Sequence, residues 1–105
     1  MINYDLSKIG VLTVEKQAPM RTLLRQVLRE FGVKKIDDAM MPEDGFELFC
    51  ETTPDLVLVN WAPDFDGLKL VQRIRTDGES VFPQVPVIMV TAFNETSYIF
   101  EALDA

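Results

Sequence analysis

The chain alternates short apolar runs with segments of helical period, and this alternation restricts its fold more than any other feature. The runs "IGVLTV" (9–14), "DLVLVN" (55–60) and "VPVIMVT" (85–91) are almost continuously apolar, which is typical of strands buried on both faces. A weaker strand is predicted over 33–38. Alternation of this kind predicts parallel strands joined by right-handed crossovers, with helices on both faces of the sheet.

The first predicted helix lies between the first two strands. Pro19 opens it, where the missing N–H of proline costs nothing, and Gly32 follows its last residue in the usual C′ position. Its apolar residues recur with helical period, and they are Met20, Leu23, Leu24, Val27, Leu28 and Phe31.

Three further helices are predicted along the chain. The second covers 42–51, the third is capped by Asp66, and the fourth is capped by Asn94. Their predicted inward residues are Phe46 and Phe49, then Leu68, Val71 and Ile74, then Ile99, Phe100 and Leu103.

Composition excludes several classes of function. The 105 residues predict one domain, 1–105, and the net charge of −7 argues against direct nucleic-acid binding. No apolar run approaches the ~18 residues of a membrane span, and the absence of histidine removes the usual general base and most transition-metal sites. Cys50 is the only cysteine, so we expect a core residue in a cytoplasmic protein without an internal disulfide.

Polar residues follow three of the predicted strands. Ligand sites of open parallel sheets lie beyond the carboxyl ends of the central strands. Those ends are marked here by Glu15 and Lys16, by Asn60 and Trp61, and by Thr91 and Ala92. The sequence therefore predicts a site at this end of the sheet.

Three segments resemble a receiver domain of bacterial two-component response regulators, the group that includes the chemotaxis receiver. They are "VLTVEKQAPMR", "PDLVLVNWAPDFDGLKLVQRIR" and "VPVIMVTA", in this order and spacing, and the resemblance covers essentially the whole chain. It implies an α/β fold with a doubly wound parallel sheet of flavodoxin-like type. The implied strand order is 2-1-3-4, with the family's fifth strand and fifth helix absent from these residues.

The resemblance also assigns positions to the site. In that family an aspartate on the third strand accepts a phosphoryl group from a histidine kinase, two acids after the first strand help to hold Mg²⁺, and a hydroxyl after the fourth strand bonds the phosphoryl group. These positions fall on Asn60, on Glu15 and Lys16, and on Thr91. The family's fifth-strand lysine has no counterpart, and the loop that contains Ala62 looks one residue shorter than usual.

Chemistry at these positions departs from the family. An acyl phosphate needs a carboxylate nucleophile, whereas Asn60 offers an amide. Glu15, Lys16 and neutral Asn60 sum to zero charge, and each lost unit charge about 4 Å away removes on the order of 4 kcal/mol of attraction for a cation. We therefore expect a degenerate receiver without metal, cofactor or enzymatic activity, in which the Lys16 ammonium takes the place of the metal beside Glu15 and Asn60.

Other interpretations stay open. Asn60 could be an ordinary polar residue at a strand end, or an engineered change in a working receiver. Asp64 or Asp66, which suit a turn and a helix cap, could act as a surrogate acceptor, with Mg²⁺ held by Glu15 and the Ala62 carbonyl. Trp61 could pack over the site or contact a partner. A flavin carrier of the same sheet type is disfavoured, because "EKQAPMR" contains neither glycine nor hydroxyl.

The absent fifth strand and helix bear on partners. Without them the strand 85–91 becomes an apolar sheet edge, and the helix residues Leu23, Val27 and Phe31 lose part of their cover. We expect contact with a signalling protein, either a histidine kinase or an output protein, or with a second copy through the fourth strand and fourth helix. No contact with a membrane is expected.

Overall fold

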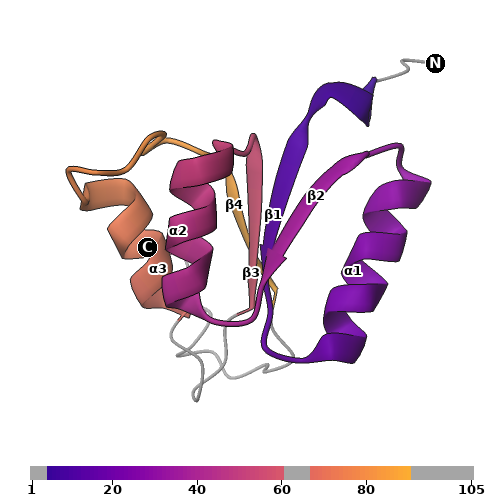
Figure 1. Cartoon of the computed structure of the whole chain (residues 1–105), viewed down its shortest axis with the longest axis horizontal. Helices are drawn as coiled ribbons and strands as arrows, with labels where there is room; N and C mark the ends of the chain where they lie inside the picture. Colours follow the sequence, from indigo (N-terminus) through magenta and orange to yellow (C-terminus); the bar gives the residue numbers. More distant parts are fainter. Residues whose placement is uncertain (1–4, 61–66, 91–105) are drawn as a thin grey trace.

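Four parallel strands form the centre of the molecule. The computed structural model describes residues 5–60 and 67–90. Its strands lie in the order β2-β1-β3-β4, which confirms the order that the resemblance implies (Figure 1). They are β1 (Gly10–Val14), β2 (Lys35–Ala39), β3 (Leu56–Asn60) and β4 (Val87–Val90).

Strand register sets the geometry at the carboxyl end of the sheet. Val14 of β1 is paired with Val59 of β3, so the next residues, Glu15 and Asn60, lie side by side. Asn60 is paired with Val90 on its other side. The two central polar residues of the predicted site are therefore brought together by register alone.

In the described ranges three α-helices flank the sheet, α1 on one face and α2 and α3 on the other (Figure 1). A short 3-10 helix, Leu6–Lys8, precedes β1. None of the described helices is long and apolar enough to cross a membrane. The helices are α1 (Ala18–Glu30), α2 (Pro42–Thr52) and α3 (Gly67–Thr76).

The end of α1 explains why β2 starts later than the predicted 33–38. The Val33 N–H donates to the Leu28 carbonyl at 3.0 Å, and the Gly32 N–H donates to the Arg29 carbonyl at 3.0 Å. These bonds form the closing motif of a helix whose C′ glycine has a positive φ, here 97°. Val33 is thus used to cap α1, and pairing with β1 begins only at Lys35.

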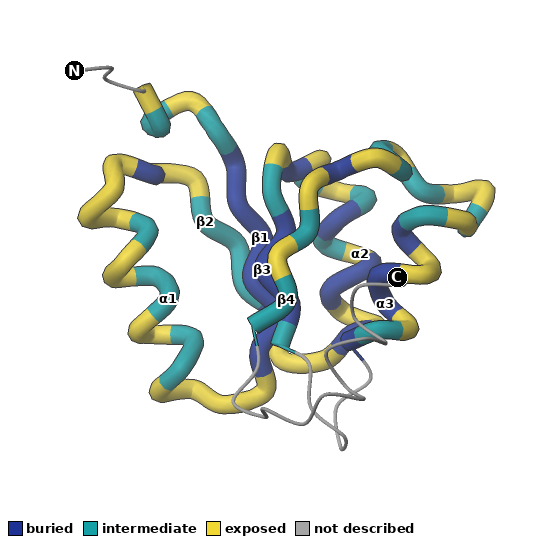
Figure 2. The backbone as a smooth tube through the Cα atoms, turned by 180° about the vertical axis from the view of Figure 1, so that it is seen from behind, coloured by how far each residue is buried: buried dark blue, intermediate teal, exposed yellow. Residues whose placement is uncertain are grey.

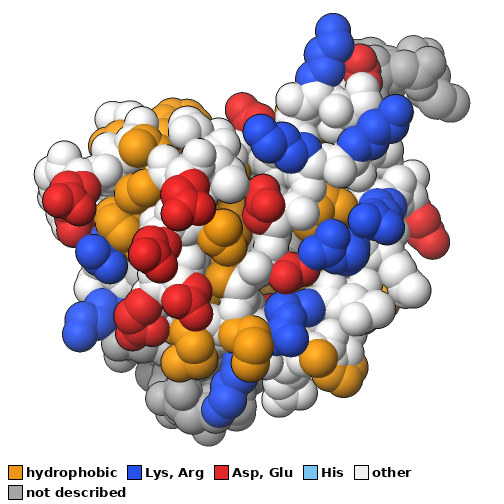
Figure 3. Space-filling model, viewed as in Figure 1, with side chains coloured by type: hydrophobic (Ala, Val, Ile, Leu, Met, Phe, Trp, Pro, Cys, Tyr) orange, Lys and Arg blue, Asp and Glu red, His pale blue; other side chains and the backbone are white. Residues whose placement is uncertain are grey.

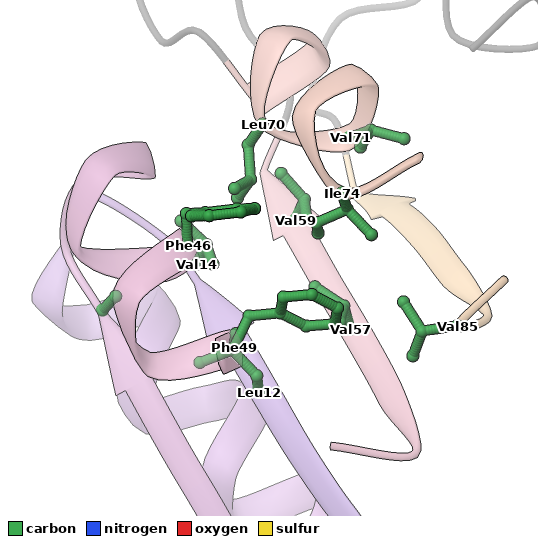
Figure 4. Close-up of a cluster of buried hydrophobic side chains, with 11 residues drawn as sticks. Leu12, Val14, Phe46, Phe49, Val57, Val59, Leu70, Val71, Ile74 and Val85 are labelled. Carbon is green, nitrogen blue, oxygen red and sulfur yellow. The ribbon is translucent and has the colours of Figure 1, made fainter. Parts of the chain in front are cut away.

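The face covered by α2 and α3 holds the main core. Phe46 and Phe49 of α2 point into it, as predicted, and their ring centroids lie 6.0 Å apart (Figure 4). Cys50 packs at its margin. The buried members are Leu12, Val14, Ala39, Phe46, Phe49, Val57, Val59, Leu70, Val71, Ile74 and Val85.

The face covered by α1 is much thinner. Within the described part of the chain its buried cluster consists of Val11, Val33 and Leu58, and no residue of α1 is fully buried (Figure 2). Leu24 and Leu28 pack against this cluster, whereas Leu23, Val27 and Phe31 are exposed, which confirms that part of the helix lacks cover. On β4 the Ile88 side chain is 52% exposed.

Candidate functional site

Glu15 is a buried acid at the carboxyl end of β1. Its exposed fraction is 1%, although it lies in the loop between β1 and α1. One carboxylate oxygen, Oε1, accepts a hydrogen bond from the Gln17 N–H at 3.1 Å, and the other, Oε2, accepts one from the Asn60 side chain. Burial of an acid is tolerated when both oxygens are bound in this way.

Asn60 donates through its amide nitrogen, Nδ2, to this carboxylate. The family's acceptor position is thus occupied by a hydrogen-bond donor that points at the first acid. The amide oxygen, Oδ1, is enclosed and has no hydrogen-bond partner within the described part of the chain. Asn60 is partly buried, and the bond to Glu15 satisfies its amide nitrogen. Loss of that bond would leave the buried acid without one of its donors.

Arg21 holds the loop that carries the acid. Its Nη1 donates to the carbonyl oxygens of Glu15 and Lys16, at 2.8 Å in each case. The guanidinium reaches back from the first turns of α1, so loop and helix are joined at the site. A planar multidentate donor suits this bridging of two carbonyl groups.

Gly67 begins α3 directly against the end of β3. A Cβ at this position would overlap the carbonyl oxygen of Asn60 and would lie 2.7 Å from Cγ1 of Val59. Only glycine fits such a close approach of two backbones. The glycine of the "DG" pair is therefore required by the backbone position of the candidate acceptor residue.

Lys16 is exposed, and the structure gives a different partner for the acid than the sequence predicts. Among the described residues, the donors to the Glu15 carboxylate are Asn60 and the Gln17 backbone, rather than the Lys16 ammonium. The remaining predicted site residues lie outside the described ranges, and they are Trp61, Ala62, Asp64, Asp66, Thr91 and Ala92. The predicted fourth helix lies there as well.

Sequence reasoning missed the roles of Arg21 and Gln17. Arg21 was visible only as the basic residue that follows the two-acid position of the motif, and its distance of five and six residues from the bonded carbonyls carries no periodic signal. Gln17 contributes through its backbone, which no side-chain motif could reveal.

The described residues of the site do not fit a divalent cation. Mg²⁺ prefers several oxygen ligands, usually including one or two carboxylates. The described residues supply one carboxylate, and both of its oxygens already accept hydrogen bonds. They contain no group of three or more acidic, cysteine or histidine side chains that could hold a metal.

Proteins of known sequence resemble the chain along most of its length. It is 27% identical over 97 residues to the chemotaxis protein CheY1 of Helicobacter pylori, a match that spans 90% of this chain and 77% of that protein. It is 32% identical over 98 residues to the transcriptional regulatory protein AfsQ1 of Streptomyces coelicolor. That match spans 91% of this chain but only 40% of the Streptomyces protein.

A solved structure and a family description agree with this similarity. The N-terminal domain of an uncharacterized protein from Wolinella succinogenes superimposes with a TM-score of 0.72 at 27% identity, covering 91% of this chain and 74% of that one. Residues 11–105 match the family described as the response regulator receiver domain. The parallel sheet and its strand order are those that the family resemblance implies. The chain belongs to the response regulator receiver domain family.

Proposed function

We propose that this receiver domain signals through protein contacts and accepts no phosphoryl group. One observation carries the proposal: the amide of Asn60 donates to the buried Glu15 carboxylate at the position where an acceptor aspartate would stand. An amide cannot attack a phosphoryl donor, and both oxygens of the only carboxylate among the described site residues already accept hydrogen bonds, which compete with Mg²⁺. The pocket is closed by its own side chains.

The alternative function is that of a working phosphoacceptor. It requires either that a nearby acid, such as Asp64 or Asp66, accepts the phosphoryl group, or that Asn60 is an engineered substitution of an aspartate in a working receiver. Mg²⁺ would then be held by Glu15 and the Ala62 carbonyl. Where Asp64 or Asp66 is the acceptor, Glu15 would first have to release the Asn60 amide, which disfavours that route.

Incubation with acetyl phosphate and Mg²⁺, followed by intact mass measurement, separates the two functions. We expect no mass gain for the natural chain. The double variant Asn60→Asp/Lys16→Asp restores three acids to the pocket, and we expect it to gain one phosphoryl group. A gain by the natural chain, located by peptide mapping at Asp64 or Asp66, would contradict the proposal.

Trp61 offers a second measurement, because it is the only tryptophan and directly follows Asn60. We expect its fluorescence to stay constant when Mg²⁺ or beryllofluoride is titrated. The double variant serves as the positive control, since restored acids bring back the oxygen ligands that Mg²⁺ requires. A saturable change in the natural chain would show that its pocket binds the ion.

We place the signalling contact on the β4 side of the molecule. β4 pairs with β3 alone among the described strands, and its Ile88 side chain is exposed. Leu23, Val27 and Phe31 of α1 are exposed as well. An unpaired apolar edge and an uncovered helix stripe each favour a protein partner. We propose a cytoplasmic histidine kinase or output protein as this partner, with a second copy bound through β4 and the following helix as the alternative.

A further inference from the structure

Charge is divided unevenly along the chain. Residues 1–35 contain seven basic and three acidic residues, a net charge of +4, although the whole chain carries −7. Residues 36–105 contain three basic and fourteen acidic residues, a net charge of −11. One of the three early acids, Glu15, is buried, so the surface contrast is sharper still.

Both signs meet on one face of the molecule. Acidic side chains gather over α2 and basic side chains over α1 and β2 (Figure 3). Two of the arginines are already committed, Arg21 to loop carbonyls and Arg25 to Asp38. Further exposed charges include Asp44, Glu47 and Glu51 on α2, and Arg29, Lys34 and Lys35 at the end of α1 and the start of β2.

An apolar pair lies between the two halves in the chain. Met40 and Met41 join β2 to α2 and are 53% and 44% exposed. Methionine side chains adapt well to a partner surface. β2 pairs with β1 alone among the described strands, and its sequence "KIDDA" carries three charges that discourage strand addition. Contact here would therefore use side chains, which are apolar at the carboxyl end of β2 and charged along α2 and along the start of β2.

We propose that this face binds a second copy of the chain across a two-fold axis that runs roughly along the strands. We call it the β2-side face, formed by Met40, Met41 and the six charges named above. Such an axis places the acidic α2 of each copy against the basic α1–β2 region of the other, so the two charge contacts are equivalent. The methionines of both copies meet between them. The contact does not depend on whether residue 60 accepts a phosphoryl group.

Self-complementarity favours a second copy over other occupants. A nucleic acid or an anionic lipid surface would match only the basic half and would be repelled by α2 and by the net charge of −7. A wholly basic partner would match only the acidic half. A second copy matches both halves at once, because each carries the charge that the other needs.

Sedimentation of the whole chain tests the proposal. We expect a concentration-dependent rise of the mass above 11.9 kDa at about 50 mM salt, and a weaker rise at about 1 M salt, where charges are screened within a few ångströms. Two variants reverse one half each, Glu47→Lys/Glu51→Lys and Lys34→Glu/Lys35→Glu. Each alone is expected to raise the dimer dissociation constant about tenfold or more.

The two variants also separate a specific contact from general charge repulsion. Each exchange alters the net charge by two, so the acidic-half variant carries −3 and the basic-half variant −11, against −7 in the natural chain. General repulsion predicts tighter association for the −3 variant, whereas the proposed contact predicts weaker association for both. Mixing the two variants should restore a dimer, because both contacts of the mixed pair again join opposite charges.

A matched control uses single exchanges. Lys35→Glu should weaken the dimer, whereas Lys69→Glu on α3, with the same change of charge, should leave it intact. Circular dichroism confirms that each variant is folded. A natural chain that stays monomeric at low salt, a dimer indifferent to both reversals, or a mixture that fails to associate would each overturn the proposal.

Discussion

Among the described residues, the face of the sheet that α2 and α3 cover has a buried cluster of eleven residues, helix residues included, and the face that α1 covers has one of three. The same strands supply both faces, since Val57 and Val59 of β3 point into the larger cluster and Leu58 into the smaller one. The difference lies in the helices. α1 leaves an apolar stripe in solvent, whereas α2 and α3 bury theirs.

This difference indicates that the α2–α3 face supplies most of the stability of the fold and that the α1 face is available for contact with a partner. Burial of apolar area stabilises by roughly 25 cal/mol per Å², so the α2–α3 face holds most of the stabilising area. The α1 face keeps apolar area that a partner could still bury. The α2–α3 face of the sheet is thus well covered, whereas the α1 face leaves apolar side chains exposed.

The largest expected effect comes from removing an aromatic ring on the α2–α3 face. Phe49→Ala deletes a side chain with no exposed surface, and we expect a loss of about 3–5 kcal/mol in the free energy of unfolding. Phe31→Ala is the matched control on the α1 face. Phe31 is 68% exposed, so this exchange should cost less than about 0.5 kcal/mol. Urea unfolding measures both. Equal losses would mean that the two faces contribute alike.

The next effect concerns the polar contact, which lies on the α1 side of β3 because Asn60 shares a face with Leu58. Asn60→Ala leaves the buried Glu15 Oε2 without its donor, and we expect a loss of about 1–3 kcal/mol at pH 7. Gln17→Ala is the control, because Gln17 donates through its backbone and keeps its bond. If Asn60→Ala unfolds at the same urea concentration as the natural chain, the contact contributes nothing to stability.

A smaller effect tests how tightly α2 packs on the sheet. A Cβ at Gly45 would lie 2.8 Å from Cγ2 of Val14, so Gly45→Ala forces a shift that costs about 1–3 kcal/mol. The gain of about 1 kcal/mol in helix propensity offsets part of that cost. Gly78→Ala, with no atom within 4 Å of the added Cβ, should change stability little. A stabilised Gly45→Ala variant would show that this side has spare room.

The smallest effect concerns Cys50 at the margin of the larger core. Burial raises the pKa of its thiol, with the nearby Glu79 adding to the shift. At pH 8 alkylation by iodoacetamide should therefore be several-fold slower than that of the unfolded chain. The neutral thiol stabilises the fold below the unfolded pKa, and this contribution is lost as the pH rises toward the folded pKa. Equal rates in the folded and unfolded chain would contradict the pKa shift.

Much of the fold could be predicted because it depends on local patterns. The continuous apolar runs identify strands buried on both faces, and the family resemblance supplies their order. The exposure of Leu23, Val27 and Phe31 follows from the same reasoning, since no described element covers that side of α1. The start of β2 was placed too early because Val33 serves the end of α1, a choice that depends on hydrogen bonds between neighbouring elements.

Two of the predicted site residues, Glu15 and Asn60, lie in contact, but the bond between them could not be predicted from the sequence. Glu15 and Asn60 are 45 positions apart, and only strand register brings them together. Lys16 has the charge expected for a partner of Glu15, yet the structure gives the carboxylate two N–H donors that carry no charge. Charge alone could not reveal this, because the choice of partner depends on which side chains the loop directs inward.

The close approach of Gly67 to the Asn60 carbonyl has a consequence for protein engineering. Any side chain at that position would collide with the peptide group of Asn60, a contact that involves the backbone of residue 60 and not its side chain. The position of α3 against β3 therefore depends on the backbone of residue 60 and not on which side chain residue 60 carries. A phosphorylation-controlled biosensor could therefore be designed on this domain by exchanging side chains, such as those of residues 16 and 60, around an unchanged backbone.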